Sequence, residues 1–299
     1  MSEFDSNILY GRRYRVIVDS LNVSELRCTF RIEKNMTQTP NFSEISIFNL
    51  SAQSENMLVK TGQRVVLEAG YEGDQYGLIF DGDIVQPFRD KENGVTYVLT
   101  LVSQDGDQFL NNGFVNVSFR AGQTPRDIVN SVATLATNPA ELASISEGLK
   151  DTRLPRGKVC FGLAKDYLCQ IAKTEQAAFY VSDGKVNIVK ATDVPKGQVI
   201  NLTPHSGLIG AAEWTDEGVR AKCLLNPMLN LNSYVHIDPS IVREQKAQRD
   251  SQPRQVDDSG IFRIVSLIHS GDTRGTDWYT EFVAIAQTGF EPNTGSSML

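Results

Sequence analysis

Apolar and polar residues alternate with a period of two through most of the first hundred positions. In the stretch 27–33, Cys28, Phe30 and Ile32 fall on one side and polar residues on the other, which is typical of a half-buried β-strand. Similar alternation recurs in three further runs: 14–18, 65–71 and 97–101. Segments rich in Asn, Gly, Asp and Ser (51–56, 70–77 and 90–94) separate the runs. About six strands at this spacing, with no long helix among them, predict a closed or nearly closed antiparallel barrel.

The period changes after about residue 110. Thr124, Pro125 and Asp127 form the start signal of a helix, with an N-cap hydroxyl, a proline at the first helical position and an acid three residues after the cap. A second helix is predicted from about Phe161 to Lys173. It is followed by two short strands around 182–185, where Asp-Gly favours a tight type I′ turn. Residues 111–200 therefore predict a small α+β domain.

Period-two alternation returns from about residue 201. Four groups of apolar residues are each expected to share a strand face: Val219, Ala221, Cys223 and Leu225; Val235 and Ile237; Phe262, Ile264 and Ile268; and Trp278, Phe282 and Ala284. The segment 243–260 is dense in charge and Gln and predicts a long mobile loop between strands. The small, polar tail 291–299 is expected to be flexible.

The first and last thirds share an order of parts: a strand, a loop, a second strand, a turn and a third strand. In the first third these strands are 65–71, 78–88 and 96–102, and in the last third 234–238, 261–269 and 278–285. Residue identity between the two is negligible. Internal duplication and the general likeness of antiparallel barrels both account for the match.

Composition and charge narrow the class of protein. The 299 residues, 40% of them hydrophobic, suffice for one large domain or for two to three small ones. The net charge of −7 argues against a protein that binds nucleic acid through its phosphates. An acidic surface could still line a channel through which a polyanion passes without binding. No apolar run is long enough for a membrane helix, and the polar, acidic start lacks the pattern of a secretory signal. The four scattered cysteines favour buried thiols in a reducing cytosol over a disulfide framework.

Candidate chemistry is sparse. His236 and Asp238 share a strand face, but no third residue is spaced to complete a metal site. The stretch Gly271–Trp278 has backbone amides and Arg274 that suit an anion, whereas its position between two strands favours a hairpin loop. Phosphate-loop, nucleophile-elbow and zinc-protease motifs are absent from the sequence. We therefore predict no catalytic, cofactor-binding or metal-binding residue, and no enzyme.

Two passages in the last third contain sequence motifs of a known family. One spans 207–227 and ends in Leu-Leu-Asn-Pro; the other spans 262–279 and contains His-Ser-Gly-Asp-Thr-Arg-Gly-Thr-Asp-Trp. Both resemble the baseplate hub proteins of contractile-tailed phages and related injection systems, the late control gene D or tail hub family. The strand pattern of the first third and the segment 179–184 after the second helix also fit.

The resemblance implies two antiparallel β-barrels, similar to those of tail tube proteins, joined by a small α+β part. The expected domains are 1–110 (first barrel), 111–200 (middle) and 201–299 (second barrel, with the loop 243–260 and the flexible tail).

The resemblance further implies a homotrimeric ring that adapts a sixfold tail tube to a threefold spike and leaves a channel for DNA. The implied partners are the tail tube protein, a separate spike protein, and wedge or tape-measure proteins. The implied place is the virion tail baseplate, with assembly in the host cytoplasm. As subunit or partner contacts we predict Arg243, Arg249, Arg254, Asp272 and Arg274.

Two other classes of function stay open at this stage. A tail-associated peptidoglycan hydrolase would need paired acids that meet only in the fold. A host-surface carbohydrate-binding tail protein would be expected to expose aromatic clusters, whereas Trp214 and Trp278 both lie beside predicted strands.

Overall fold

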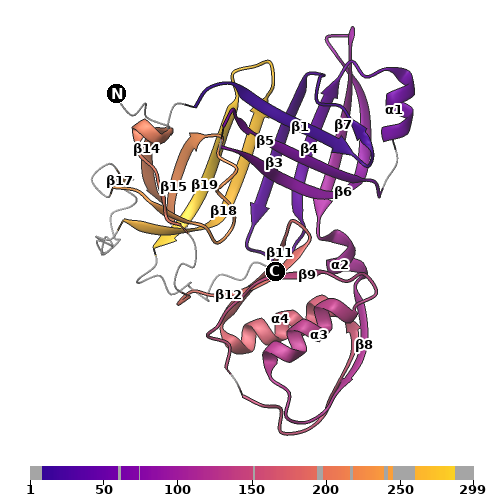
Figure 1. The fold of residues 1–299 in the computed structure, drawn as a ribbon, viewed down its shortest axis with the longest axis vertical. Coiled ribbons are helices and arrows are strands. Elements are labelled where there is room, and N and C mark those ends of the chain that lie inside the picture. Colours follow the sequence, from indigo (N-terminus) through magenta and orange to yellow (C-terminus); the bar gives the residue numbers. More distant parts are fainter. Residues whose placement is uncertain are drawn as a thin grey trace, which may run out of the picture.

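The computed structural model describes residues 9–59, 62–73, 75–150, 152–193, 198–215, 218–238, 242–244 and 260–286. The fold is mainly β and its sheets are mostly antiparallel, as predicted (Figure 1). None of its helices, within the part described, is long and apolar enough to cross a membrane.

The first third forms strands that wrap around one hydrophobic cluster. Its elements are β1 (Arg12–Val18), β2 (Leu21–Asn22), β3 (Cys28–Asn35), β4 (Asn41–Phe48), α1 (Ala52–Leu58), β5 (Arg64–Tyr71), β6 (Tyr76–Glu92) and β7 (Thr96–Asp105). The predicted alternation is confirmed, because Cys28, Phe30 and Ile32 are all buried. The segment 51–56 was predicted to be irregular, but most of it is helical. Ser51 caps α1 by accepting a hydrogen bond from the Ser54 amide, which supplies the local signal that was overlooked.

The middle third forms a smaller α+β unit below the large sheet in Figure 1. Its elements are α2 (Asp107–Asn112), β8 (Phe114–Phe119), α3 (Pro125–Leu135), β9 (Glu141–Ile145), β10 (Lys158–Leu163), α4 (Ala164–Glu175), β11 (Ala177–Ser182) and β12 (Lys185–Lys190). Strands β8 and β10 form a two-stranded ribbon, and β9, β11 and β12 form a second sheet. The helix predicted from Thr124 is confirmed with its capping box, and Asp183 and Gly184 adopt the positive φ angles of a type I′ turn.

The second helix begins later than predicted. Phe161 belongs to β10, where Cys160 points into the hydrophobic cluster of the middle unit and Phe161 points away from it. The hydroxyl of Tyr167 hydrogen-bonds to both backbone groups of Phe161 and so holds that residue in the strand. The apolar residues at the start of the predicted helix belong to β10, because a short apolar run suits a strand as well as a helix.

The last third wraps around a further hydrophobic cluster. Its elements are β13 (Ile200–Asn201), a short 3₁₀ helix (Pro204–Ser206), β14 (Leu208–Thr215), β15 (Gly218–Leu224), β16 (Tyr234–His236), β17 (Arg243–Glu244), β18 (Ile261–Asp272) and β19 (Trp278–Ala286). Arg243 was predicted to open the long loop. Its backbone instead pairs in parallel with Glu213 of β14. Most of the predicted loop (245–259) and the whole of the predicted flexible tail lie outside the described residues.

Strand β18 joins the two β parts. Residues 261–263 of this strand pair with β16, and residues 266–272 pair with β3. The described strands of both thirds therefore form one fourteen-stranded sheet. A bulge lies between Ile264 and Ser266. The extra residue reverses the side-chain alternation, so Leu267 and His269 are buried while Ile268 is only partly buried. The prediction that Ile268 shares a face with Phe262 and Ile264 is therefore wrong.

Candidate functional site

The continuous sheet presents one face that spans both β parts. On the far side from the hydrophobic clusters, the register aligns Tyr279, Ser270, Arg31, Glu44 and Val102 in one row across five neighbouring strands. Lys222, Glu281, Ile268 and Glu33 form the row beside it. We call these two rows the common face. Every side chain named in them is at least partly exposed.

Charges of opposite sign lie next to each other on the common face. Lys222 Nζ is 3.1 Å from Glu281 Oε1, and Arg31 Nε is 2.8 Å from Glu33 Oε1. Lys222 also lies 3.4 Å from the centroid of the Tyr279 ring. Because the charges of each pair nearly cancel, these pairs leave little net field to hold a polyanion.

The hairpin between β18 and β19 contains two predicted contact residues, Asp272 and Arg274. The Asp272 carboxylate accepts hydrogen bonds from Arg27 at 2.8 Å and from the Arg274 amide at 2.9 Å. These interactions, with that of Arg27 the largest, lower the pKa of Asp272. The Asp272 carboxylate thus occupies the place of the anion that the sequence of 271–278 suits. The stretch joins the paired strands β18 and β19, so the hairpin interpretation is confirmed. Arg274 is exposed at the tip.

A residue that sequence reasoning missed fastens this hairpin to the first third. The Arg12 guanidinium donates hydrogen bonds to the carbonyl oxygens of Gly275 at 2.7 Å and Thr276 at 3.1 Å. It also lies 5.4 Å from the centroid of the Trp278 ring, within range of a cation–π contact. Since Arg12 is on β1 and the hairpin is in the last third, these contacts link the two β parts a second time.

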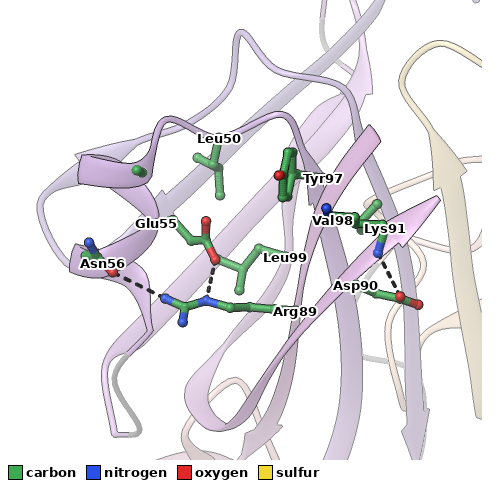
Figure 2. A pocket seen from close by; sticks show the side chains of 10 residues that line it. Leu50, Glu55, Asn56, Arg89, Asp90, Lys91, Tyr97, Val98 and Leu99 are labelled. Atoms are coloured by element: carbon green, nitrogen blue, oxygen red, sulfur yellow. Dashed lines mark hydrogen bonds and ion pairs between the residues drawn. The ribbon is translucent and has the colours of Figure 1, made fainter. Parts of the chain in front are cut away.

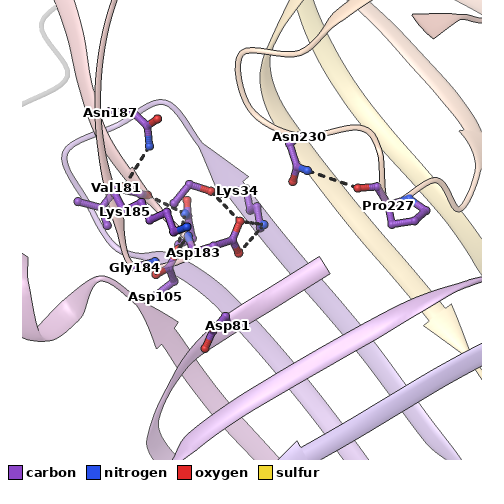
Figure 3. Close-up of polar contacts among 12 residues, drawn as sticks. Lys34, Asp81, Asp105, Val181, Asp183, Gly184, Lys185, Asn187, Pro227 and Asn230 are labelled. Atoms are coloured by element: carbon purple, nitrogen blue, oxygen red, sulfur yellow. Dashed lines mark hydrogen bonds and ion pairs between the residues drawn. The ribbon is translucent and has the colours of Figure 1, made fainter. Parts of the chain in front are cut away.

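A buried polar cluster joins the middle unit to the large sheet (Figure 3). Lys34, on the inner side of β3, is fully buried, and its Nζ lies 2.8 Å from both carboxylate oxygens of Asp183. Asp105, at the end of β7, accepts hydrogen bonds from the Asp183 and Gly184 amides, the second at 2.7 Å. Asn41 donates to the Val181 carbonyl at 2.9 Å. The tip of the β11–β12 hairpin is thereby held against the sheet by charge and by hydrogen bonds.

Burial sets the protonation of two groups in this region. Desolvation, reinforced by the nearby Asp183, raises the pKa of Asp105 to about 6. His269 is fully buried on strand β18, next to β3, and burial lowers its pKa to about 3. Its Nδ1 lies 2.9 Å from Thr280 Oγ1. His269 is therefore a neutral structural side chain at ordinary pH.

A second link to the middle unit comes from the last third, through Arg263. Its guanidinium is buried and donates to the carbonyl oxygens of Lys190 at 2.8 Å, Ala191 at 3.2 Å and Asp193 at 3.2 Å. These four hydrogen bonds satisfy three carbonyl acceptors of one short segment, which would otherwise be difficult to satisfy in a buried place. No pattern in the sequence marks Arg263, because the residues on both sides of it are buried as well.

A pocket of about 560 Å³ lies where α1 meets the β6–β7 hairpin (Figure 2). Arg89 forms an ion pair with Glu55 and donates a hydrogen bond to Asn56 at 3.3 Å, so its charge is already satisfied within the chain. Tyr97 and Leu99 line the wall beside it. The pocket has the character of a packing gap under a short helix, and we assign no ligand to it.

Among the described residues, no group of three or more His, Cys, Asp or Glu side chains is arranged to hold a metal ion. His236, which the sequence paired with Asp238 as a conceivable start of a site, has its Nδ1 3.0 Å from Asn201 Oδ1. Of the predicted contacts, Arg243 is described only by its backbone, and Arg249 and Arg254 lie outside the described residues. Asp272 and Arg274 lie together in the β18–β19 hairpin.

Solved structures share this architecture. The tail protein of Neisseria meningitidis MC58 is 11% identical, with a TM-score of 0.60 over 92% of this chain and 96% of that one. The 43 kDa tail protein of prophage MuSo2 from Shewanella oneidensis is 10% identical, with a TM-score of 0.61 over 93% and 97%. The E. coli c3393 protein, a component of the type VI secretion system, is 11% identical, with a TM-score of 0.51 over 95% and 79%. At such identities the likeness concerns the fold alone, and that fold is the one of phage tail proteins.

The family of the chain can be identified from its sequence. The model of the family described as baseplate hub gp41 matches residues 11–242. The chain belongs to the baseplate hub gp41 family. No curated protein matches the sequence. The predicted resemblance to phage baseplate hubs is thereby confirmed at the level of a tail baseplate-type protein.

Proposed function

We propose that this chain is a structural hub of a phage tail baseplate and not an enzyme. In this proposal three copies form a ring that joins a sixfold tail tube to a threefold spike and leaves a channel for DNA. The observation that carries the proposal is the continuous sheet, in which β18 pairs with β3 and fuses the strands of two hydrophobic clusters. A single chain thus supplies two barrel-like parts in a fixed relation, and three chains supply six.

The common face supports the assignment of a channel wall. It spans both β parts, and its paired charges suit a surface along which a polyanion passes without binding. We propose that it faces the ring axis. The proposed domains are 1–110, 111–200 and 201–299. Each third contributes most of one hydrophobic cluster, but Leu225 and Trp278 from the last third pack into the first cluster.

The proposed partners are the tail tube protein on one side of the ring, a separate spike protein on the other, and wedge or tape-measure proteins. Arg274, exposed at its hairpin tip, stays a proposed contact, with Asp272 holding that hairpin in shape. Arg243, Arg249 and Arg254 stay proposed contacts as well. A contractile tail and assembly in the host cytoplasm, where the free cysteines would stay reduced, complete the proposal.

The decisive experiment is an electron cryomicroscopy reconstruction of the assembled tail, in which copies of this chain are counted in the ring. Three copies with the common face lining the channel are expected. Closed cyclic symmetry is required, because an open head-to-tail contact would grow into a filament. Six copies per ring, or a common face that points away from the axis, would overturn the adaptor mechanism.

A further inference from the structure

The β8–β10 ribbon of the middle unit exposes an apolar face. Val115, Phe119 and Cys160 point into the hydrophobic cluster, whereas the alternate residues Phe114, Val159 and Phe161 point outward. The outward residues are 40%, 67% and 66% exposed. The rings of Phe114 and Phe161 pack edge to face, with centroids 5.0 Å apart. Apolar side chains clustered in this way on a sheet face are typical of an interaction surface.

Both edges of the ribbon are capped at its apolar end. Tyr167 Oη accepts from the Phe161 amide at 2.8 Å and donates to the Phe161 carbonyl at 3.1 Å. The amide and the hydroxyl of Thr137 donate to the Phe114 carbonyl at 2.9 and 3.0 Å. Because these backbone groups are occupied, a partner cannot extend the ribbon by adding a strand there. At this end a partner therefore docks on the face, through side chains.

The opposite end of the same face is basic. Arg120 continues the outward positions 114, 116 and 118 of β8. Hydrogen bonds between the segments 122–123 and Leu154 bring the loop that carries Arg153 and Arg156 to the same end. All three arginines are exposed, and within the described part of the chain no ion pair of Arg120 or Arg156 is present. No acidic residue occupies an outward position of the ribbon, although the whole chain carries a net charge of −7.

We propose that the outer face of the β8–β10 ribbon is a docking surface for another protein, one whose surface combines aromatic or aliphatic side chains with carboxylates. The apolar part of the partner packs on Phe114, Val159 and Phe161, and its carboxylates pair with Arg120 and Arg156. The separation of the basic side chains from the aromatic ones favours a protein over a nucleic acid as the partner. The aromatic and basic ends lie about 20 Å apart along β8, whereas a strand of nucleic acid needs basic side chains beside its stacked bases.

The test uses the full chain and a fluorescent random copolymer of glutamate and tyrosine, compared with polyglutamate of equal length. Binding is measured by fluorescence anisotropy at low and at high salt. We expect tighter binding of the copolymer than of polyglutamate. Phe161→Ser is expected to weaken copolymer binding about tenfold or more, as for a central aromatic anchor. The double variant Arg120→Ser, Arg156→Ser is expected to remove most of the salt dependence.

Matched controls separate the ribbon from general surface effects. Phe88→Ser removes an exposed aromatic residue of the first third, and Lys173→Ser removes an exposed charge on α4 of the same unit; neither is expected to change binding. Circular dichroism verifies that every variant folds. Equal binding of both polymers, tighter binding of single-stranded DNA, or unchanged binding by Phe161→Ser would each overturn the proposal. Self-association that Phe161→Ser abolishes would overturn it too, because the occupant would then be a second copy of this chain.

Discussion

Lys34 Nζ lies 2.8 Å from both carboxylate oxygens of Asp183, and this contact joins strand β3 to the tip of a hairpin in the middle unit. The lysine is fully buried, and the second carboxylate, Asp105, is buried beside it. One fully buried cation therefore offsets the charge of two carboxylates, of which Asp105 is buried and Asp183 partly exposed. This cluster and the Arg263 contacts together hold the middle unit against the sheet.

Lys34→Ala is expected to destabilise the protein by about 3 kcal/mol, because it leaves the buried carboxylate of Asp105 and the partly buried one of Asp183 without their cation. The matched control is Lys185→Ala, whose partner Glu141 lies 3.5 Å away with both side chains largely exposed. That variant is expected to change the free energy of unfolding by less than about 1 kcal/mol. Urea denaturation followed by tryptophan fluorescence measures both. Equal losses in the two variants would show that burial does not govern the Lys34 contact.

Asp105 predicts a pH dependence of stability. Its pKa in the folded protein is about 6, above the ordinary value, so the folded state holds the proton more tightly than the unfolded state. The contribution of Asp105 to stability is therefore greatest at low pH and falls as the pH rises from about 4 to about 6, by up to about 3 kcal/mol.

The comparison with Asp105→Asn isolates this contribution, because the variant lacks the carboxyl group. It is needed because His269 acts in the opposite direction: its pKa of about 3 makes folding less favourable as the pH falls below the ordinary histidine value. The difference in free energy of unfolding between wild type and variant, measured at intervals from pH 4 to pH 7, should decline up to about pH 6 and then stay level. Parallel profiles would refute the assignment.

Gly271 is expected to tolerate no side chain. It lies opposite Phe30 across the β18–β3 pairing, and a Cβ atom there would sit 2.3 Å from the Phe30 ring and 2.8 Å from the Trp278 ring. Gly271→Ala should destabilise the protein by about 1–3 kcal/mol through overpacking. Gly77→Ala in β6 is the control, since the nearest atom to its added Cβ, on Pro227, is at 3.5 Å. Thermal unfolding of the two variants side by side would decide, and a larger loss for Gly77→Ala would contradict the packing argument.

The proposal of a structural role predicts that the purified chain does not digest peptidoglycan and contains no stoichiometric zinc or iron. The prediction on metal content rests on the lack, among the described residues, of a convergent group of metal ligands. A zymogram on cell-wall material and elemental analysis test the two statements. A clearing zone that migrates with the chain would favour the hydrolase alternative instead.

Much of the local structure could be predicted because it depends on nearby residues. The alternation of Cys28, Phe30 and Ile32 identifies the buried face of β3, since a strand repeats every two residues. The same alternation, extended by two positions, marks Lys34 as inward-facing, and the signal was present although it was not used. Its partner, Asp183, could not be inferred, because nothing local connects positions 149 residues apart.

The pairing of β18 with β3 was decided only in three dimensions. Ser266 and Asn35 meet across this seam although 231 residues separate them, and the direction in which each β18 side chain points depends on one bulge after Ile264. Hydrophobic periodicity determines that a strand forms and which residues share a face as long as the strand is regular. It contains no information about which distant edge satisfies the backbone groups of that strand, because register follows from the packing of both faces and both edges at once.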